Sequence, residues 1–238
     1  MKKAIVVGAT SGIGKGLALL LANNNYKVGI TGRREELLDF LRLEKPDSFL
    51  VRAFDVTNTK ETIEKLEELT NELGGLDLLI ISSGTGDINV NLDFEIEKRT
   101  INTNVLGFTS VADWAFNYFE RQKFGHLTAI SSIGGIRGSR QAPAYNATKA
   151  YQINYLEGLI QKTTSLKSPI FVTDIRPGLV DTAMAKGEGL FWLMPVDKTV
   201  KQIYKAIIEK RKVAYVTKRW TLMAVILKIM PRFIYERM

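Results

Sequence analysis

Short apolar runs alternate with longer amphipathic stretches along most of the chain. The apolar runs lie near residues 3–8, 27–31, 49–54, 77–82, 126–131 and 169–175. Between them, apolar residues recur at the spacing of helices that bury one face. Buried strands that alternate with helices are typical of a parallel sheet covered on both faces. The pattern therefore predicts an α/β fold with a doubly wound sheet, because right-handed crossovers lead to that order.

No break in this pattern marks a boundary between domains. The 238 residues are enough for one α/β domain, and no internal repeat, low-complexity segment or Pro/Gly-rich linker divides them. Hydrophobic residues make up 45% of the chain and charged residues 24%, which excludes disordered, collagen-like and coiled-coil proteins. We expect residues 1–238 to form a single domain of the Rossmann type.

A glycine-rich turn follows the first predicted strand. The segment from Gly8 to Gly14 reads Gly-Ala-Thr-Ser-Gly-Ile-Gly, which lets the backbone turn tightly and approach a pyrophosphate at the start of the next helix. Gly32, Arg33 and Arg34 follow the second strand, where a carboxylate would mark a cofactor without a 2′-phosphate. Guanidinium groups here favour NADPH over NADH, because they bind phosphate through forked hydrogen bonds. A solvated charge pair at a helix start is the alternative for at least one of these arginines.

The ends of the other predicted strands place further residues at the same edge of the sheet. Residues 55–56 follow the third strand and residues 82–84 the fourth, where an adenosine would lie. Ser132 ends the fifth strand and is well placed to hydrogen-bond a substrate oxygen. Residues 176–178 follow the sixth strand in a tight turn that would form a wall beside a nicotinamide.

Tyr145 and Lys149 are four residues apart, which places them on one face of a helix. A phenol beside a fixed cation has its pKa lowered toward neutral pH and becomes a usable proton donor. The same spacing is common on ordinary amphipathic helices, where the lysine is a solvated charge. This pair is distinguished by its position downstream of Ser132 and of the glycine-rich turn.

Together and in this order, these motifs resemble the short-chain dehydrogenase/reductase family from Lys3 through about Thr182. The glycine spacing, three residues and then one, is similar to that of the short single-domain members. The resemblance implies an NADP(H)-dependent oxidoreductase that interconverts a ketone or aldehyde and an alcohol. The preference for NADP(H) over NAD(H) is predicted from Gly32, Arg33 and Arg34.

The resemblance implies roles for individual residues. Tyr145 is expected to be the general acid or base, Lys149 to lower its pKa and hold the nicotinamide ribose, and Ser132 to bind the substrate oxygen. Asn104 is expected to hold a water that links the lysine to solvent, and Ser131 to support the turn. With Gly14 and Arg34 from the turns above, the expected cofactor-binding residues are Gly8, Ser11, Gly12, Ile13, Gly14, Arg33, Arg34, Asp55, Val56, Gly84, Tyr145, Lys149, Pro177, Gly178 and Thr182.

One segment departs from the family pattern. The family has Asn-Asn-Ala-Gly or Asn-Ala-Gly after the fourth strand, whereas this chain has Ser82, Ser83 and Gly84. The family asparagine steadies the central strands. The change therefore bears on local rigidity and substrate polarity and not on hydride transfer.

The positive charge is concentrated at the carboxyl end of the chain. Of a net charge of +8, residues 198–238 contribute eleven Lys and Arg against two Glu. This distribution argues against a nucleic-acid-binding fold, which has a basic stripe across the domain body. Residues 218–238 form a basic, apolar tail that is too short to span a membrane and fits an interfacial helix. A contact between subunits, or a cap over the partner's substrate site, is an equal alternative.

Apolar side chains are also frequent in residues 182–197, where family members place a mobile substrate lid. They are Met184, Leu190, Phe191, Trp192, Leu193 and Met194. Such a lining suggests an apolar carbonyl or alcohol as the substrate, and the glycines between Lys186 and Gly189 favour a movable loop. A helix packed on the core is the alternative for any one of these residues.

Two other functions are open at this point. One is a 3-ketoacyl reductase, in which the basic tail would meet an acidic carrier protein bearing a thioester-linked substrate. The other is a catalytically silent NADP(H)-binding regulator, against which the complete set of Ser132, Tyr145, Lys149 and Asn104 weighs. The family also implies a homodimer or homotetramer, paired through the helices that carry Asn104 and Tyr145.

The chain contains no cysteine, which excludes disulfides and thiolate metal sites, and we predict no metal centre. His126 lies at the start of the fifth predicted strand, far from its carboxyl end, and is predicted to be structural. The first apolar run is too short for a signal peptide and is interpreted as a strand. We therefore expect a cytoplasmic protein that the tail could bring to a membrane.

Overall fold

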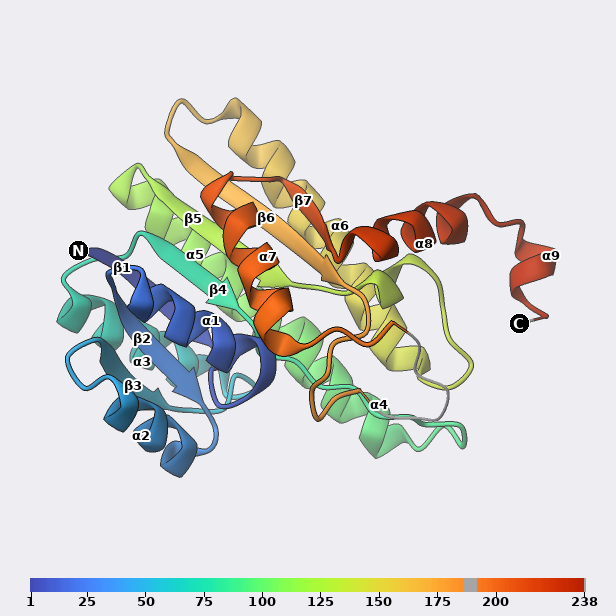
Figure 1. Ribbon diagram of the computed structural model, residues 1–238, viewed down its shortest axis with the longest axis horizontal. Helices are drawn as coiled ribbons and strands as arrows, with labels where there is room; N and C mark the ends of the chain where they lie inside the picture. Colours follow the sequence, from blue (N-terminus) through green and yellow to red (C-terminus); the bar gives the residue numbers. More distant parts are fainter. Residues whose placement is uncertain (186–191, 238) are drawn as a thin grey trace.

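The computed structural model describes residues 1–185 and 192–237. These residues form one parallel sheet of seven strands in the order β3-β2-β1-β4-β5-β6-β7 (Figure 1). The strands are β1 (Lys2–Val7), β2 (Tyr26–Gly32), β3 (Phe49–Ala53), β4 (Leu78–Ile81), β5 (Gly125–Ile130), β6 (Ile170–Pro177) and β7 (Val213–Val216). The strand order reverses between β1 and β4, so the doubly wound sheet predicted from the apolar runs is confirmed.

Six of these strands coincide with the predicted ones to within two residues at each end, and β7 was not predicted. This last strand has four residues and lies at the edge of the sheet, where Val213 is 40% exposed. It also follows directly after three cationic residues. Such a short run in a charged surrounding does not give the continuous apolar pattern that identifies a buried strand.

Helices cover both faces of the sheet (Figure 1). Those on one face are α1 (Gly12–Asn23), α2 (Glu35–Glu44) and α7 (Val196–Ile208), and those on the other are α3 (Thr59–Leu73), α5 (Phe108–Gln122) and α6 (Pro143–Ser165). In β1, Ala4 and Val6 pack into the first layer and Ile5 and Val7 into the second. Because successive side chains point to opposite faces, both sets must be apolar, which explains the continuous apolar run.

A turn of π-helix interrupts the helix that precedes β5. α4 (Phe94–Ile101) continues through η1 (Asn102–Gly107) into α5, and the backbone amide of Phe108 donates to the carbonyl oxygen of Thr103 five residues earlier. A side chain at Gly107 would place its Cβ 2.8 Å from the carbonyl oxygen of Val56, so glycine allows this close approach. The π-turn contains Asn104, one of the predicted site residues.

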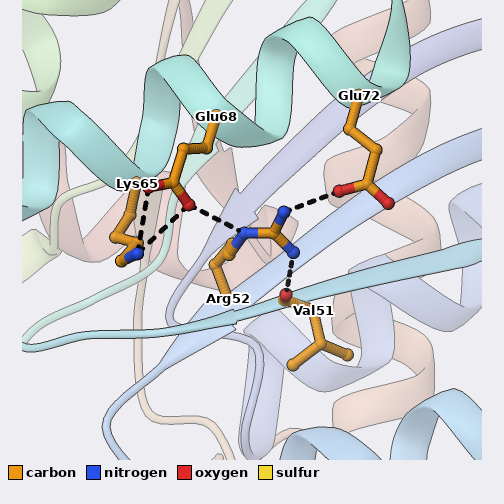
Figure 2. Close-up of polar contacts among 5 residues, drawn as sticks. All are labelled: Val51, Arg52, Lys65, Glu68 and Glu72. Carbon is orange, nitrogen blue, oxygen red and sulfur yellow. Dashed lines mark hydrogen bonds and ion pairs between the residues drawn. The ribbon is translucent and has the colours of Figure 1, made fainter.

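The edge strand β3 is tied to α3 by a group of charged side chains (Figure 2). The guanidinium of Arg52 lies 3.2 Å from a carboxylate oxygen of Glu68 and 2.7 Å from one of Glu72, and it also donates to the Val51 carbonyl at 2.8 Å. Lys65 pairs with the same Glu68 carboxylate at 3.0 Å. These contacts fix the end of the sheet from which the predicted adenosine-binding turn emerges.

After β7, the chain continues into α8 (Lys218–Ile229) and α9 (Arg232–Tyr235), which project beyond the sheet (Figure 1). The inner side of α8 buries Trp220 and Ala224 against Ile133 of η2 (Ile133–Ile136). Within the described ranges, no helix is both long and apolar enough to cross a membrane.

Candidate active site

A cavity of about 680 Å³ opens at the carboxyl ends of the strands. The predicted site residues that line it are Gly8, Ser11, Gly12, Ile13, Arg33, Arg34, Asp55, Val56, Gly84, Ser132, Tyr145, Lys149, Pro177, Gly178 and Thr182. Gly14 and Asn104 are not part of this lining. Gly14 instead packs the helix start against the turn, since a Cβ there would lie 2.0 Å from the carbonyl oxygen of Gly8. Asn104 is fully buried behind the cavity wall.

The glycine-rich turn is closed against the end of β4. Gly8 has φ +91°, and a Cβ at this position would lie 2.6 Å from the backbone nitrogen of Ser83. Only glycine combines that backbone conformation with that approach. On the other side, the methyl group of Thr182 would be 3.1 Å from a Cβ on Gly12, so the turn after β6 lies against the glycine turn.

Both predicted phosphate-binding arginines border the cavity. The guanidinium of Arg34 donates to the hydroxyl oxygens of Thr10 at 2.7 Å and Ser11 at 3.2 Å. Arg33 lies 3.6 Å from the carboxylate of Asp55, and its side chain is 65% exposed. Gly32 lets these groups come together, because a Cβ there would lie 2.6 Å from Thr10. The two cations are therefore held beside the glycine turn.

Ser132 and Tyr145 lie next to each other in the lining of the cavity. Pro143 begins α6, which places Tyr145 in the first turn of the helix, opposite the end of β5. The Ser132 hydroxyl accepts the amide hydrogen of Gly134 at 3.0 Å, and a Cβ on Gly134 would lie 3.3 Å from this hydroxyl oxygen and 3.5 Å from the Tyr145 ring. Gly86 lies under the phenol ring, where a Cβ would come within 2.3 Å of it.

The pKa of Tyr145 differs from the value expected for a phenol beside a fixed cation. Burial raises this pKa above its ordinary value, and the hydrogen bond from Ser132 acts in the opposite direction. The ammonium of Lys149 lies 5.8 Å from the centroid of the ring and is directed to other partners. In the protein alone, loss of water around the phenol therefore outweighs the predicted effect of the lysine.

Lys149 is 4% exposed and is held by two oxygen atoms. Its Nζ donates to the carbonyl oxygen of Ile130 at 3.0 Å and to the side-chain oxygen of Gln152 at 2.9 Å. Burial lowers the pKa of Lys149 to about 8, and the nearby carboxylate of Asp174 opposes this change. At neutral pH the ammonium is therefore mostly protonated, and it loses its proton at mildly alkaline pH.

Asp174 belongs to a buried ion pair on β6. Its carboxylate lies 2.6 Å from the guanidinium of Arg176, which also donates to the Tyr215 hydroxyl at 3.0 Å. The Ser131 hydroxyl contacts the same carboxylate and the carbonyl oxygen of Ile175, so its side chain is bonded to β6. Burial raises the pKa of Asp174, while Arg176 counteracts that rise.

The side chain of Asn104 clamps the loop that follows β4. Its oxygen accepts the Thr85 amide hydrogen at 2.9 Å, and its nitrogen donates to the Thr85 carbonyl at 2.7 Å and to the Thr148 hydroxyl at 3.0 Å. This is the loop in which serines replace the family asparagine. In the part of the chain that the structure describes, the buried Ser83 hydroxyl has no hydrogen-bond partner, so Asn104 supplies much of the local support.

The loops after β4, β5 and β6, together with α8, add both apolar and polar side chains to the cavity. The apolar ones include Ile88, Ile133, Leu179, Met184 and Trp220, and the polar ones include Asp87, Ser139 and Gln141. The indole of Trp220 lies directly on Gly178, where a Cβ would come within 2.1 Å of the ring. The tail therefore contributes a wall to the cavity of its own chain, a role that was not among the alternatives considered for it from the sequence.

The predicted lid at 182–197 is described only at its two ends. The backbone amide of Asp181 donates to the carbonyl oxygen of Met194 at 2.8 Å, and the amide of Met194 donates to the carbonyl oxygen of Leu179 at 3.0 Å. The two ends of the predicted lid therefore lie side by side. Trp192 and Leu193 are 43% and 39% exposed. The rest of the predicted lid, residues 186–191 with the glycine break, Leu190 and Phe191, lies outside the described residues.

Three residues around the site were not among the sequence predictions. Gln152 follows Lys149 by three positions, which places it on the same helix face. Asp174 lies two residues before Arg176 in a buried strand, and a buried charge usually needs a partner of opposite charge. Both signals were available in the sequence. Trp220 gave none, because nothing in its neighbourhood indicates that the tail folds back on the turn after β6.

His126 lies at the opposite end of the sheet, as predicted. Its ring nitrogen is 2.8 Å from the Thr173 hydroxyl, and burial lowers the pKa of His126 to about 4. In the described ranges, no group of three or more His, Cys, Asp or Glu side chains could hold a metal ion.

Comparison with known proteins gives consistent results. A family model described as short chain dehydrogenase matches residues 2–190. An uncharacterised oxidoreductase of Myxococcus xanthus is 32% identical over 214 residues, which cover 87% of this chain and 84% of that protein. Among solved structures, ElxO with NADP bound has a TM-score of 0.80 at 23% identity, with 90% of this chain and 96% of that chain covered.

A short chain dehydrogenase/reductase from Burkholderia phymatum in complex with NAD has a TM-score of 0.84 at 17% identity. The alignment covers 94% of this chain and 92% of that one. At these identities, the two structures support the fold alone. The family match and the Myxococcus relative carry the further conclusion that this chain is an oxidoreductase of the short-chain dehydrogenase family.

Proposed function

We propose that this protein uses NADP(H) to interconvert an apolar ketone or aldehyde and the corresponding alcohol. The observation that carries the proposal is that Ser132, Tyr145 and Lys149 line the same cavity, with Ser132 and Tyr145 close together beside Gly134, where a Cβ would lie 3.3 Å from the Ser132 oxygen and 3.5 Å from the Tyr145 ring. Two adjacent hydroxyl donors at one point of a cavity are suited to bind a single carbonyl oxygen.

The residues at the other end of the cavity fit a dinucleotide. Gly8 and Gly14 leave no room for side chains, so backbone amides at the start of α1 can approach a pyrophosphate. Arg33 and Arg34 offer two guanidinium groups beside this turn, and a 2′-phosphate binds such groups through charge-assisted hydrogen bonds. Because NADP occurs in one structural neighbour and NAD in another, the arginines carry the preference for NADP(H).

The chain's own residues would orient the substrate and move a proton. The nicotinamide, when bound, supplies or accepts the hydride, which no side chain can do. Ser132 and Tyr145 would donate hydrogen bonds to the carbonyl oxygen, and the Tyr145 phenol would pass its proton to that oxygen as negative charge develops. The positive charge of Lys149 favours the phenolate that is left.

A screen of carbonyl substrates tests this function. We expect purified protein to oxidise NADPH in the presence of apolar ketones and to do so less efficiently with NADH. Turnover of a carrier-linked 3-ketoacyl thioester without turnover of simple ketones would assign the reaction to thioester substrates instead. Tight NADPH binding with no oxidation by any carbonyl compound would contradict the catalytic proposal and indicate a regulator.

We further propose that the outer face of α8 contacts an anionic membrane surface. This face consists of Leu222, Val225 and Ile229, which are 61%, 49% and 75% exposed. Exposed cations accompany it, among them Arg219 and Lys228. Apolar side chains between cations are suited to the boundary of a bilayer with anionic lipids. Such a contact would bring an apolar substrate close to the cavity that Trp220 lines.

Vesicle flotation tests the membrane contact. We expect the protein to float with vesicles of phosphatidylglycerol and not with vesicles of phosphatidylcholine alone, and the variant L222N/I229N to lose this binding. Leu43→Asn is the control, because Leu43 is 71% exposed on α2 at a distance from the tail. Absence of flotation would contradict the membrane contact, and a dimer that L222N/I229N dissociates would show that this face binds another subunit.

We also propose a homo-oligomer paired through α5 and α6. Ile101, Leu106 and Tyr151 lie on or next to these helices and are 40%, 56% and 37% exposed. Burial of such side chains favours association. Light scattering after size exclusion should give a multiple of the chain mass of 26.7 kDa, and Leu106→Arg should shift it toward the monomer.

A further inference from the structure

Gln152 is a buried polar residue in the middle of α6. It is 1% exposed and lies one turn after Lys149. An amide group withdrawn from water destabilises a protein unless its donors and acceptors find partners. The partners of this side chain are therefore informative about why a glutamine occupies the position.

Both ends of the Gln152 amide are bonded to the catalytic machinery. Its oxygen accepts a hydrogen bond from Lys149 Nζ at 2.9 Å, and its nitrogen donates to the backbone carbonyl oxygen of Asn104 at 2.9 Å. In a regular α-helix, the amide of Phe108 would bond that carbonyl oxygen. Here the π-turn directs the Phe108 amide to Thr103, which leaves the Asn104 oxygen available to Gln152.

We propose that Gln152 is the positioning residue that fixes the ammonium of Lys149 relative to Asn104. The inference rests on the proposed function in so far as Lys149 serves a bound cofactor. The connection itself, from π-turn to amide to ammonium, is a property of this chain.

An amide accepts and donates hydrogen bonds but does not ionise near neutral pH. Gln152 therefore holds the ammonium in place without itself taking up or releasing a proton. The Lys149 side chain also lines the cavity.

Several charged or titratable groups surround the Lys149 ammonium. Tyr145 lies on the same helix, and Asp174, paired with Arg176, approaches from β6. β5 contributes the Ile130 carbonyl oxygen. Against this background, a change at Gln152 alters the contact nearest to the ammonium while leaving the ion pair on β6 intact.

Two substitutions of similar size test the proposal because they should act in opposite directions. Gln152→Leu removes the acceptor, so we expect the pKa of Lys149 to fall. Gln152→Glu places a carboxylate at the same position, so we expect that pKa to rise by roughly 1 to 3 units, as for other adjacent opposite charges. A residue that only fills space would not produce opposite shifts.

The direct measurement is an NMR titration of protein labelled with ¹³C at lysine Cε. The Lys149 signal is identified by its absence from Lys149→Met, and its midpoint is followed in wild type and in both Gln152 variants. Gln161→Leu and Gln161→Glu are the controls, because Gln161 is exposed on the same helix. This readout needs no cofactor, so it holds even if the proposed function fails.

Cofactor binding gives the second readout. At pH 7 we expect the Kd for NADPH to rise roughly tenfold in Gln152→Leu, in line with the loss of one hydrogen bond to a charged group. Opposite midpoint shifts in the two variants, with unchanged Gln161 controls, establish the positioning role. Unchanged midpoints, or shifts in the same direction, would overturn it whatever the activity.

Discussion

The two halves of the cavity are built in different ways. The half under α1 and β2 is shaped by backbone, since Gly8, Gly12 and Gly14 bring main-chain atoms close together and hydroxyls hold Arg34. The half under η2 and α8 is shaped by side chains, above all Trp220 and Met184. Backbone geometry fits a ligand part that does not vary, such as a pyrophosphate, whereas apolar side chains can differ in size and so select among substrates.

The largest effect should come from Tyr145, which lies where the halves meet. In Tyr145→Phe we expect kcat to fall by about 10²- to 10⁴-fold, the usual contribution of general acid catalysis, with an unchanged Kd for NADPH. Tyr151→Phe is the matched control. Tyr151 lies on α6 as Tyr145 does, but its hydroxyl hydrogen-bonds Thr109 of α5. An active Tyr145→Phe enzyme would contradict the assigned role.

The cofactor half is tested by its arginines. The double variant R33A/R34A should raise the KM for NADPH by roughly 10- to 100-fold, the value of hydrogen bonds to a charged group, and leave the KM for NADH nearly unchanged. Arg42→Ala, on α2 and paired with Asp39, serves as the control. Equal increases in the KM for NADPH and for NADH would mean that the arginines do not bind the 2′-phosphate.

The substrate half is tested at Trp220. Trp220→Phe should change the KM for bulky apolar ketones by roughly 3- to 10-fold, as expected for a modest change in pocket volume, and leave the KM for NADPH unchanged. Trp114→Phe makes the same change in the core, where Trp114 is 7% exposed. If both variants alter KM alike, general destabilisation explains the result and the Trp220 wall does not select substrates.

The smallest effect on activity should come from His126, remote from both halves. The pKa of His126 is about 4 in the folded protein and near 6.5 when unfolded, so the unfolded chain takes up the proton first as pH falls. The stability present above pH 6.5 is therefore lost as pH falls toward 4, by about 3 kcal/mol from this group. In urea unfolding, the free energy of unfolding of His126→Gln should therefore fall less between pH 7.5 and pH 4.5 than that of wild type. Its kcat/KM should be unchanged.

Much of the site could be predicted because its chemistry follows the strand ends. Tyr145, Lys149 and Ser132 are brought together as expected, and the glycine turn meets the end of β4. The predicted pKa of Tyr145 was not found in the protein alone. Spacing along a helix gives the distance between two side chains, but not how much water each of them loses or which other acceptors compete for the ammonium.

The sequence by itself determined six of the seven strands, the doubly wound type of the sheet and the residues at its carboxyl edge, because strand and helix periodicity are local and the parallel topology follows from them. Only the tertiary structure decided that Trp220 covers the substrate end and that Gln152 joins Lys149 to the Asn104 carbonyl. These contacts join residues far apart in sequence or depend on a π-turn that frees one carbonyl oxygen. They arise from packing, which no local pattern in the chain records.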